Sequence, residues 1–215
     1  MRHNMKKTLA ILLFCLALHA QWGVAQNTVT SIRQRYAAMK EYINTHNGTN
    51  DNDGAEWMEC YHVEARHFLP ATGGHKENVY MYFGEKENPD DLIYAKHWLK
   101  FVTTKYNYAV REYYEEYLYD EDGNIAFIYA FQPWLDIEDK SEDMDYEFRF
   151  YFNKGKLINA IVKKSPLGEN AFVEDYSGTT VKKAYQEFYQ GFIARSKDFM
   201  KLFNSMENAM YNFSD

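Results

Sequence analysis

The sequence predicts an α+β fold with an N-terminal helix, a twisted antiparallel β-meander of about six to seven strands, and a long C-terminal helical segment packed on one face. Two observations predict this order. Apolar residues recur every three or four positions near both ends of the chain, whereas short aromatic and β-branched runs separated by turn residues fill the middle. A hydrophobic content of 46%, with 18% aromatic residues, is typical of a folded chain.

The N-terminal helix is expected from Thr30 to His46, where apolar residues share one face. These residues are Ile32, Tyr36, Met39 and Ile43. Gly48 ends the pattern. The Asp51-Asn52-Asp53-Gly54 run that follows does not fit a calcium-binding EF-hand, because Cys60 occupies the position of the bidentate acid. We interpret the run as a solvated turn.

Consecutive antiparallel strands are predicted from Glu56 to about Lys164. They are Trp57–Phe68, Val79–Phe83, Trp98–Tyr108, Arg111–Tyr119, Asn124–Phe131, Tyr146–Phe152 and Lys156–Lys164. All four prolines fall outside these runs, as expected where a proline would remove a donor from the sheet. The segment Leu92–Val102 could equally open with one or two turns of helix.

A helical spacing returns from Thr180 to Phe213, with an apolar stripe typical of a helix packed on a sheet. The stripe consists of Val181, Tyr185, Phe188, Phe192, Phe199, Phe203, Met206 and Met210. A break near Arg195-Ser196 could divide this segment into two helices.

The last two predicted strands form a hairpin whose register follows from its turn. A three-residue loop with Gly155 in the left-handed conformation would pair Phe150 with Ile158 and Phe148 with Ala160. One face of the hairpin then becomes apolar. The other face carries a mixture of residues that could meet water or a ligand.

A second hairpin is predicted around the loop Glu121-Asp122-Gly123. The same loop type would pair Glu115 with Tyr129, so that Glu115 stands among aromatic rings. A slip of one residue would replace Glu115 by Glu116, because successive side chains of a strand point to opposite faces. The sequence therefore leaves open which acid joins the rings.

The first 25 residues have the parts of an export signal. An apolar run from Leu9 to Leu18 follows three basic residues and precedes the small residues of a cleavage site, Gly23-Val24-Ala25. The run is shorter than the ~20 residues that span a bilayer. We expect a single exported domain over residues 26–215, in the periplasm or outside the cell, without a membrane span.

The segments REYYEEYLYDEDGNIAFIYAFQP (Arg111 to Pro133) and FRFYFNKGKLINAIV (Phe148 to Val162) resemble the paired hairpins of small exported proteins of unknown function that are common in Bacteroidetes. The resemblance implies a secreted α+β domain. The resemblance does not identify any catalytic residue in this chain.

The two cysteines of the chain have different expected fates. Phe14 directly before Cys15 disfavours a lipid-attachment site, which requires small residues there. Cleavage of the signal would remove Cys15 and leave Cys60 unable to form an internal disulfide. We interpret Cys60 as a small buried hydrophobe, and a reactive thiol is the alternative.

The charge of the exported chain disfavours polyanionic partners. Cleavage would remove three of the 24 Lys and Arg and none of the 31 Asp and Glu, which leaves a net charge of −10. This charge repels phosphate backbones and anionic lipid surfaces. We expect no nucleic-acid partner.

Sequence motifs for catalysis and cofactors are absent. His62 and His67 lie five apart on a predicted strand, which sends their side chains to opposite faces, so no metal site is predicted. The sequence has no Gly-x-Ser-x-Gly elbow and no phosphate-binding glycine loop. We therefore predict no catalytic residue and no cofactor.

Aromatic residues are the feature that points to a function. Between Tyr106 and Phe152, 15 of 47 residues are Tyr, Phe or Trp, more than one face of a sheet can bury. Helices on both faces would make all these rings core. Alternatively, some rings line a shallow groove for a small molecule, a glycan or a peptide. The candidate ligand-binding residues are Tyr113, Glu115, Tyr117, Tyr129, Trp134 and Arg149.

We expect an exported binding or interaction protein with an aromatic-lined sheet face. One alternative is an extracytoplasmic hydrolase of glycans or peptides that uses acids such as Glu115 or Asp136. Another alternative is a protein inhibitor or scaffold module that uses an exposed sheet edge or the acidic loop Asp136–Asp145.

Overall fold

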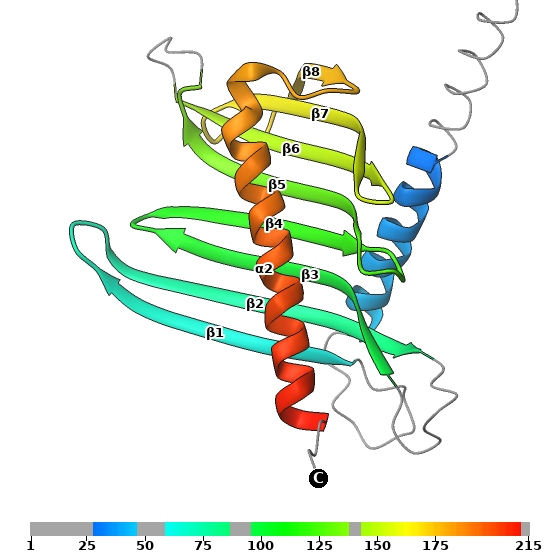
Figure 1. Cartoon of the computed structure of the whole chain (residues 1–215). Helices are drawn as coiled ribbons and strands as arrows, with labels where there is room; N and C mark the ends of the chain where they lie inside the picture. The colour runs from blue at the N-terminus through cyan, green and yellow to red at the C-terminus, as the bar shows by residue number, and fades with distance from the viewer. Residues whose placement is uncertain (1–27, 47–58, 87–95, 138–142, 212–215) are drawn as a thin grey trace, which may run out of the picture.

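Alternating side chains from Cys60 to Gly178 build one antiparallel sheet. The computed structural model describes residues 28–46, 59–86, 96–137 and 143–211, and within them each strand pairs with the next in chain order (Figure 1). The strands are β1 (Cys60–Leu69), β2 (Gly73–Lys86), β3 (Lys96–Tyr108), β4 (Arg111–Tyr119), β5 (Ile125–Leu135), β6 (Met144–Asn153), β7 (Lys156–Pro166) and β8 (Val173–Gly178). The predicted meander is confirmed, with eight strands rather than six or seven.

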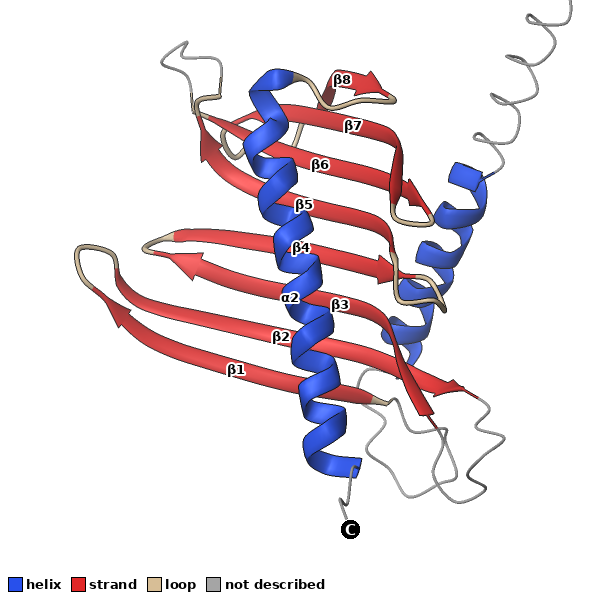
Figure 2. Ribbon diagram, in the orientation of Figure 1, coloured by secondary structure: helices blue, strands red, loops and turns tan. Residues whose placement is uncertain are grey.

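Two helices complete the fold. The predicted N-terminal helix is confirmed over residues 28–46. At the other end of the chain, a 3₁₀ turn, η1 (Lys183–Tyr185), leads into the long helix α2 (Gln186–Tyr211). Figure 2 shows α2 crossing the strands from the β8 side of the sheet to the β1 side. No helix in the described ranges is long and apolar enough to cross a membrane.

Helix α2 covers one face of the sheet with its aromatic stripe. The ring of Phe192 lies 5.6 Å from that of Phe148 in β6, and the ring of Phe203 lies 5.7 Å from that of Phe83 in β2. Successive turns of the helix therefore reach strands progressively nearer to β1. Burial of each large apolar side chain contributes about 1.5–3 kcal/mol, so this stripe holds the helix on the sheet.

The N-terminal helix packs on the opposite face. Its Ile32 is buried in a second cluster with Phe101 of β3, Leu118 of β4 and Phe127 of β5. Tyr117, the neighbour of Leu118, belongs to the cluster under α2. This alternation along β4 gives three layers, with a helix on each face of the sheet.

The hairpin between β6 and β7 is tighter than predicted. Lys154 and Gly155 both have positive φ, 48° and 72°, which is the geometry of a two-residue turn rather than a three-residue loop. With a bulge at Ile158 of β7, this turn pairs Phe150 with Ala160 instead of Ile158. The predicted register is wrong by two residues, a shift that keeps each side chain on its predicted face.

The hairpin between β4 and β5 differs from its predicted register by one residue. A bulge at Ala126 of β5, opposite Leu118 and Tyr119, places Glu116, not Glu115, opposite Tyr129. The predicted pairing of Glu115 with Tyr129 is wrong, and the structure has the one-residue slip. Glu115 consequently turns toward α2, and Glu116 turns toward the N-terminal helix.

Three further expectations are corrected. Helix α2 passes Arg195 and Ser196 without a break. Strand β8 was not predicted, and it forms by pairing along β7. Two prolines were expected outside the strands, but Pro133 lies within β5 and Pro166 ends β7. Pro133 falls where the register between β5 and β6 shifts, so it removes no hydrogen bond from the regular ladder. The predicted export signal, the loop after Gly48 and residues 92–95 lie outside the described residues.

Candidate functional site

The structure divides the six predicted ligand-binding residues among three places. The face under α2 carries Tyr113, Glu115 and Tyr117. The opposite face carries Tyr129 and Arg149. Trp134 lies at the irregular end of β5. The predicted set is therefore not one site, because the bulge in β5 places the two adjacent acids of β4 on faces opposite to those predicted.

Glu115 joins a polar network that attaches α2 to the sheet. Its carboxylate accepts hydrogen bonds from Tyr106 at 2.6 Å and Tyr117 at 2.5 Å. Arg195 of α2 forms an ion pair with it, with Nε 2.9 Å from Oε2, and also pairs with Glu77. Glu115 is 2% exposed. Its donors come from the protein itself, so we assign Glu115 to the attachment of α2.

Tyr113 and Trp134 are held by neighbouring side chains at the ends of their strands. The ring of Tyr113 stacks on that of Tyr106 at 5.0 Å. Trp134 has a φ of 59°, a left-handed conformation that is rare for a bulky residue. Its backbone N–H donates to the Asp145 carboxylate at 3.3 Å, and the Arg111 guanidinium lies 4.8 Å from the centroid of its ring. Neither residue lines the groove found on the other face.

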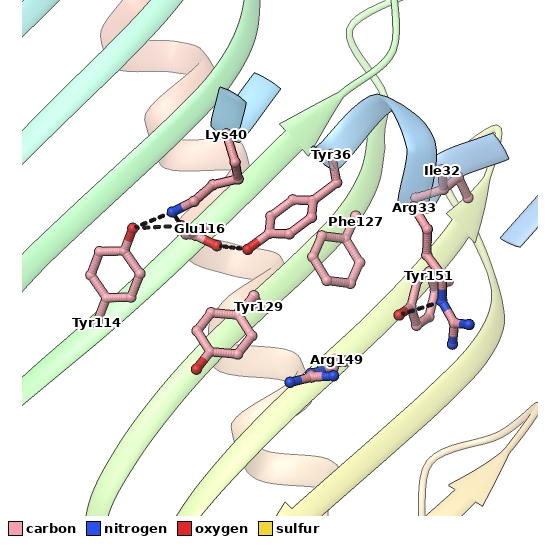
Figure 3. Close-up of a pocket in the computed structure, with 10 residues that line it drawn as sticks. All are labelled: Ile32, Arg33, Tyr36, Lys40, Tyr114, Glu116, Phe127, Tyr129, Arg149 and Tyr151. Atoms are coloured by element: carbon pink, nitrogen blue, oxygen red, sulfur yellow. Dashed lines mark hydrogen bonds and ion pairs between the residues drawn. The ribbon is translucent and has the colours of Figure 1, made fainter. Parts of the chain in front are cut away.

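A groove of about 440 Å³ lies between the N-terminal helix and strands β4, β5 and β6 (Figure 3). Five aromatic rings line it: Tyr36, Tyr114, Phe127, Tyr129 and Tyr151. Its volume lies in the usual range for small-ligand pockets, about 300–1,000 Å³. The predicted ligand-binding residues Tyr129 and Arg149 both line this groove.

Glu116 connects the two walls of the groove. This carboxylate is fully buried and lies 2.5 Å from Lys40 Nζ of the helix and 2.5 Å from the Tyr114 hydroxyl of β4. Tyr36 of the helix donates a third hydrogen bond to it. Burial, together with the Glu116 charge, raises the pKa of both tyrosines far above the ordinary value. Glu116 therefore attaches the helix to the sheet at the side of the groove.

The groove lining has more positive than negative charge. Arg33, Lys40 and Arg149 each lie over a tyrosine ring, with 5.3–5.7 Å between the charged group and the ring centroid. Lys40 is balanced by Glu116, and Arg149 by Glu147 at 2.6 Å. Arg33 forms no ion pair with any described residue, and its Nε donates to a tyrosine hydroxyl at 3.2 Å. This excess contrasts with the net charge of −7 of the whole chain.

Cys60 lies half-buried beside the cluster under the N-terminal helix. Burial raises the pKa of its thiol to about 12. The thiol is therefore protonated at neutral pH and is a poor nucleophile. These properties favour the interpretation of Cys60 as a small packing residue.

These features define an α+β protein whose meander carries a helix on each face and a cationic, aromatic groove under one of them. Comparison of the chain with protein families, curated proteins and solved structures finds no match. Any function must therefore be argued from the groove itself.

The sequence predicted only two of the ten residues that line the groove, Tyr129 and Arg149. Arg33, Tyr36 and Lys40 belong to the N-terminal helix, and no sequence signal showed which strands that helix covers. Glu116 was within reach, because a slip of one residue in the β4–β5 hairpin already exchanged it for Glu115.

Proposed function

We propose that this is a binding protein and that the groove takes an anionic ligand with an apolar or ring-shaped body. The ligand is a small molecule, or the end of a glycan or peptide, that carries a carboxylate or a similar group. The observation that supports this proposal is the surplus of cations among tyrosine rings in a chain that is otherwise acidic.

The two arginines of the groove suit different parts of this task. Arg33 is exposed and has no carboxylate partner among the described residues, so a ligand carboxylate can pair with it without displacing an internal ion pair. Arg149 already binds Glu147 and lies over the Tyr129 ring. The rings of Tyr129 and Phe127 offer a surface for the ligand body with few rotatable bonds to immobilise.

Hydrolysis is less well supported by the groove. Glycoside hydrolysis uses two carboxylates on opposite sides of the scissile bond. Among the described residues that line the groove, Glu116 is the one acid, and three donors of the protein surround it. Binding therefore accounts for the arrangement better than catalysis does.

Thermal-shift measurements with matched ligand pairs test the proposal. The pairs are octanoate with octanol and tri-galacturonate with galactotriose, each added to the wild-type protein and to Arg33→Met. A ligand at 100 times its Kd stabilises the native state by about 2.7 kcal/mol, which corresponds to a Tm increase of roughly 5–10 °C. We expect one anionic probe, and not its neutral partner, to produce this increase.

The variants locate the effect in the groove. Arg33→Met should reduce the increase in Tm by more than half, because the cation without an internal partner is lost. Lys201→Met removes one exposed charge from α2, on the other side of the sheet, and should respond like wild type. No increase with either anion, or an equal increase in Arg33→Met, would contradict the proposal.

A further inference from the structure

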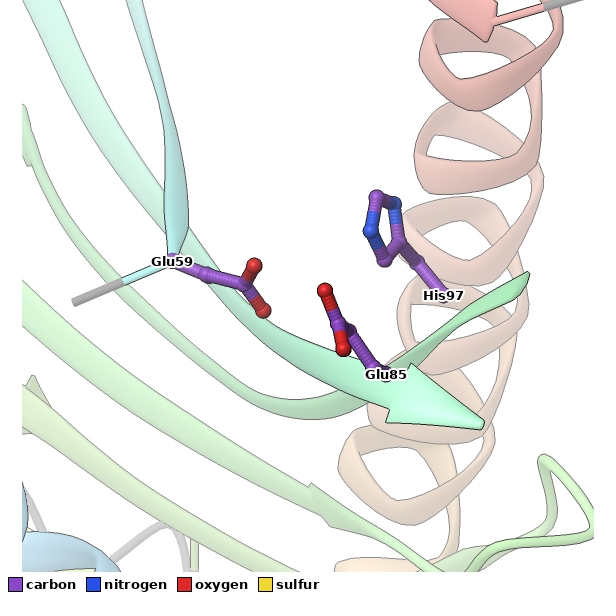
Figure 4. A group of neighbouring side chains, drawn as sticks. All are labelled: Glu59, Glu85 and His97. Atoms are coloured by element: carbon purple, nitrogen blue, oxygen red, sulfur yellow. The ribbon is translucent and has the colours of Figure 1, made fainter. Parts of the chain in front are cut away.

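Three potential metal ligands converge at one end of the sheet, away from the groove. Glu59 directly precedes β1, Glu85 lies near the end of β2, and His97 lies near the start of β3. One ligand atom from each lies within 4.8 Å of the other two. Figure 4 shows the two carboxylates and the imidazole ring directed into the same space.

The strand register explains why residues so far apart in sequence meet here. Glu85 and His97 are direct partners in the β2–β3 ladder, which places their side chains next to each other on one face. The N–H of Phe83 donates to the Glu59 carbonyl at 3.2 Å, so the chain before β1 stays beside β2. The three positions are therefore fixed by backbone pairing.

A fourth residue orients the histidine. His97 Nδ1 lies 2.8 Å from a carboxylate oxygen of Glu207 in α2, and the Tyr61 hydroxyl donates to the other oxygen. A proton on Nδ1 directed to Glu207 leaves the lone pair on Nε2, the atom that would bind a metal. This carboxylate–histidine arrangement is the usual surrounding of a metal-binding imidazole. The His97 side chain is only 10% exposed, and the ring of Phe83 packs 4.9 Å from it.

The local charge favours a cation. Glu59 and Glu85 have no side-chain hydrogen bond or ion pair with any other residue in the described ranges, although they lie close together. Glu207 adds a third carboxylate behind the ring. Two carboxylates held this close together repel each other, and a divalent cation between them would replace this repulsion by attraction to the cation.

We propose that Glu59, Glu85 and His97 bind a divalent transition-metal cation, with Glu207 holding the imidazole in the binding orientation. The nitrogen ligand selects Zn²⁺ or a similar ion over Ca²⁺ and Mg²⁺, which prefer oxygen ligands alone. Three protein ligands leave a coordination position for water or an external ligand. The bound ion would also fasten the start of β1 to β2, β3 and the end of α2.

Calorimetric titration with ZnCl₂ tests the site. The purified protein, freed of metal by a chelator, is titrated first with ZnCl₂ and then, in separate experiments, with CaCl₂ and MgCl₂. We expect one Zn²⁺ per chain and no comparable affinity for the two oxygen-preferring ions. Substitution of Co²⁺ should give visible absorption bands of a site with nitrogen and oxygen ligands.

Three variants separate ligation from folding. Glu85 is exposed, so Glu85→Gln should keep the fold, checked by circular dichroism, and lose most of the Zn²⁺ affinity. Glu207→Gln should weaken binding by about 10- to 100-fold, because it alters the partner of the imidazole. His62→Gln removes an exposed histidine of β1 that is not part of this group and should bind Zn²⁺ like wild type.

Two results would overturn the proposal. One is the absence of Zn²⁺ binding by the metal-free wild-type protein. The other is equal Zn²⁺ affinity in wild type and in folded Glu85→Gln, which would place any bound ion elsewhere.

Discussion

Removal of the Lys40 charge should loosen the N-terminal helix from the sheet. Lys40 Nζ lies 2.5 Å from Glu116, whose side chain is 1% exposed, whereas the Lys40 side chain is 36% exposed. In Lys40→Met, the carboxylate stays buried with only two tyrosine hydroxyls as donors. Loss of one partner of a fully buried ion pair costs about 3–5 kcal/mol.

Two features reduce this cost. The lysine is partly solvated, so part of its attraction to Glu116 is already screened. The tyrosine hydroxyls also continue to satisfy the carboxylate oxygens. We therefore expect Lys40→Met to lower the free energy of unfolding by about 1–2 kcal/mol, or the Tm by roughly 2–8 °C for a chain of this size.

Urea unfolding of a double-mutant cycle measures the interaction directly. The cycle comprises wild type, Lys40→Met, Glu116→Gln and the double variant. The double variant should be more stable than the sum of the single losses implies, by about 1 kcal/mol, because the second substitution removes the unpaired carboxylate. Lys201→Met, which breaks an exposed pair with Asp198, should change stability by less than about 0.5 kcal/mol.

The cycle also has a clear negative outcome. If Lys40→Met is as stable as Lys201→Met and the two groove substitutions are additive, Glu116 does not attach the helix to the sheet. The position of the helix over the groove would then lack its main polar support.

Two further predictions concern the sheet. Burial raises the pKa of Tyr82 to about 12 and raises that of Tyr119 further, whereas both ionise near 10.0 in the unfolded chain. The contribution of these two tyrosines to stability is therefore fully present below about pH 10 and is lost as the pH rises above that value. The urea midpoint should be lower near pH 11 than at neutral pH. An unchanged midpoint would contradict this prediction. Lys154→Asn should raise the free energy of unfolding by about 0.5 kcal/mol, because Asn tolerates the positive φ of a two-residue turn better than Lys. A destabilised Lys154→Asn would show that the lysine side chain makes a contact worth more than the backbone strain.

The sequence predicted the layers better than it predicted the registers. Apolar periodicity located both helices, and turn residues located seven of the eight strands. Bulges account for the errors in the predicted registers of the two hairpins. The bulge at Ala126 of β5 exchanged the faces of Glu115 and Glu116 relative to Tyr129, and bulges depend on packing that no local pattern reveals.

Two features lay beyond sequence patterns for other reasons. Strand β8 has only two apolar or aromatic side chains in VEDYSG, Val173 and Tyr176, and it exists because β7 offers a free edge. Helix α2 continues through Arg195 and Ser196 because tertiary contacts satisfy these polar residues. Arg195 pairs with Glu115 and Glu77 of the sheet, and Ser196 is buried.

The groove proposed as the ligand site followed only in part from the sequence. Tyr129 and Arg149 were expected to line a groove and do so, but their partners on the N-terminal helix were not foreseen. The convergence of His97 with Glu59 and Glu85 was also not predicted, because these residues lie far apart in the sequence and meet only through strand pairing. Cross-strand pairing of an acid with a histidine is the signal that a register prediction could have used.

Crystals of the protein grown with the anionic probe that raises the Tm most would test the proposed groove most directly. The probe carboxylate is expected within hydrogen-bond distance of the Arg33 guanidinium, with its body against the rings of Phe127 and Tyr129. A probe bound elsewhere, with the groove left to solvent, would contradict the assignment of the groove as the ligand site.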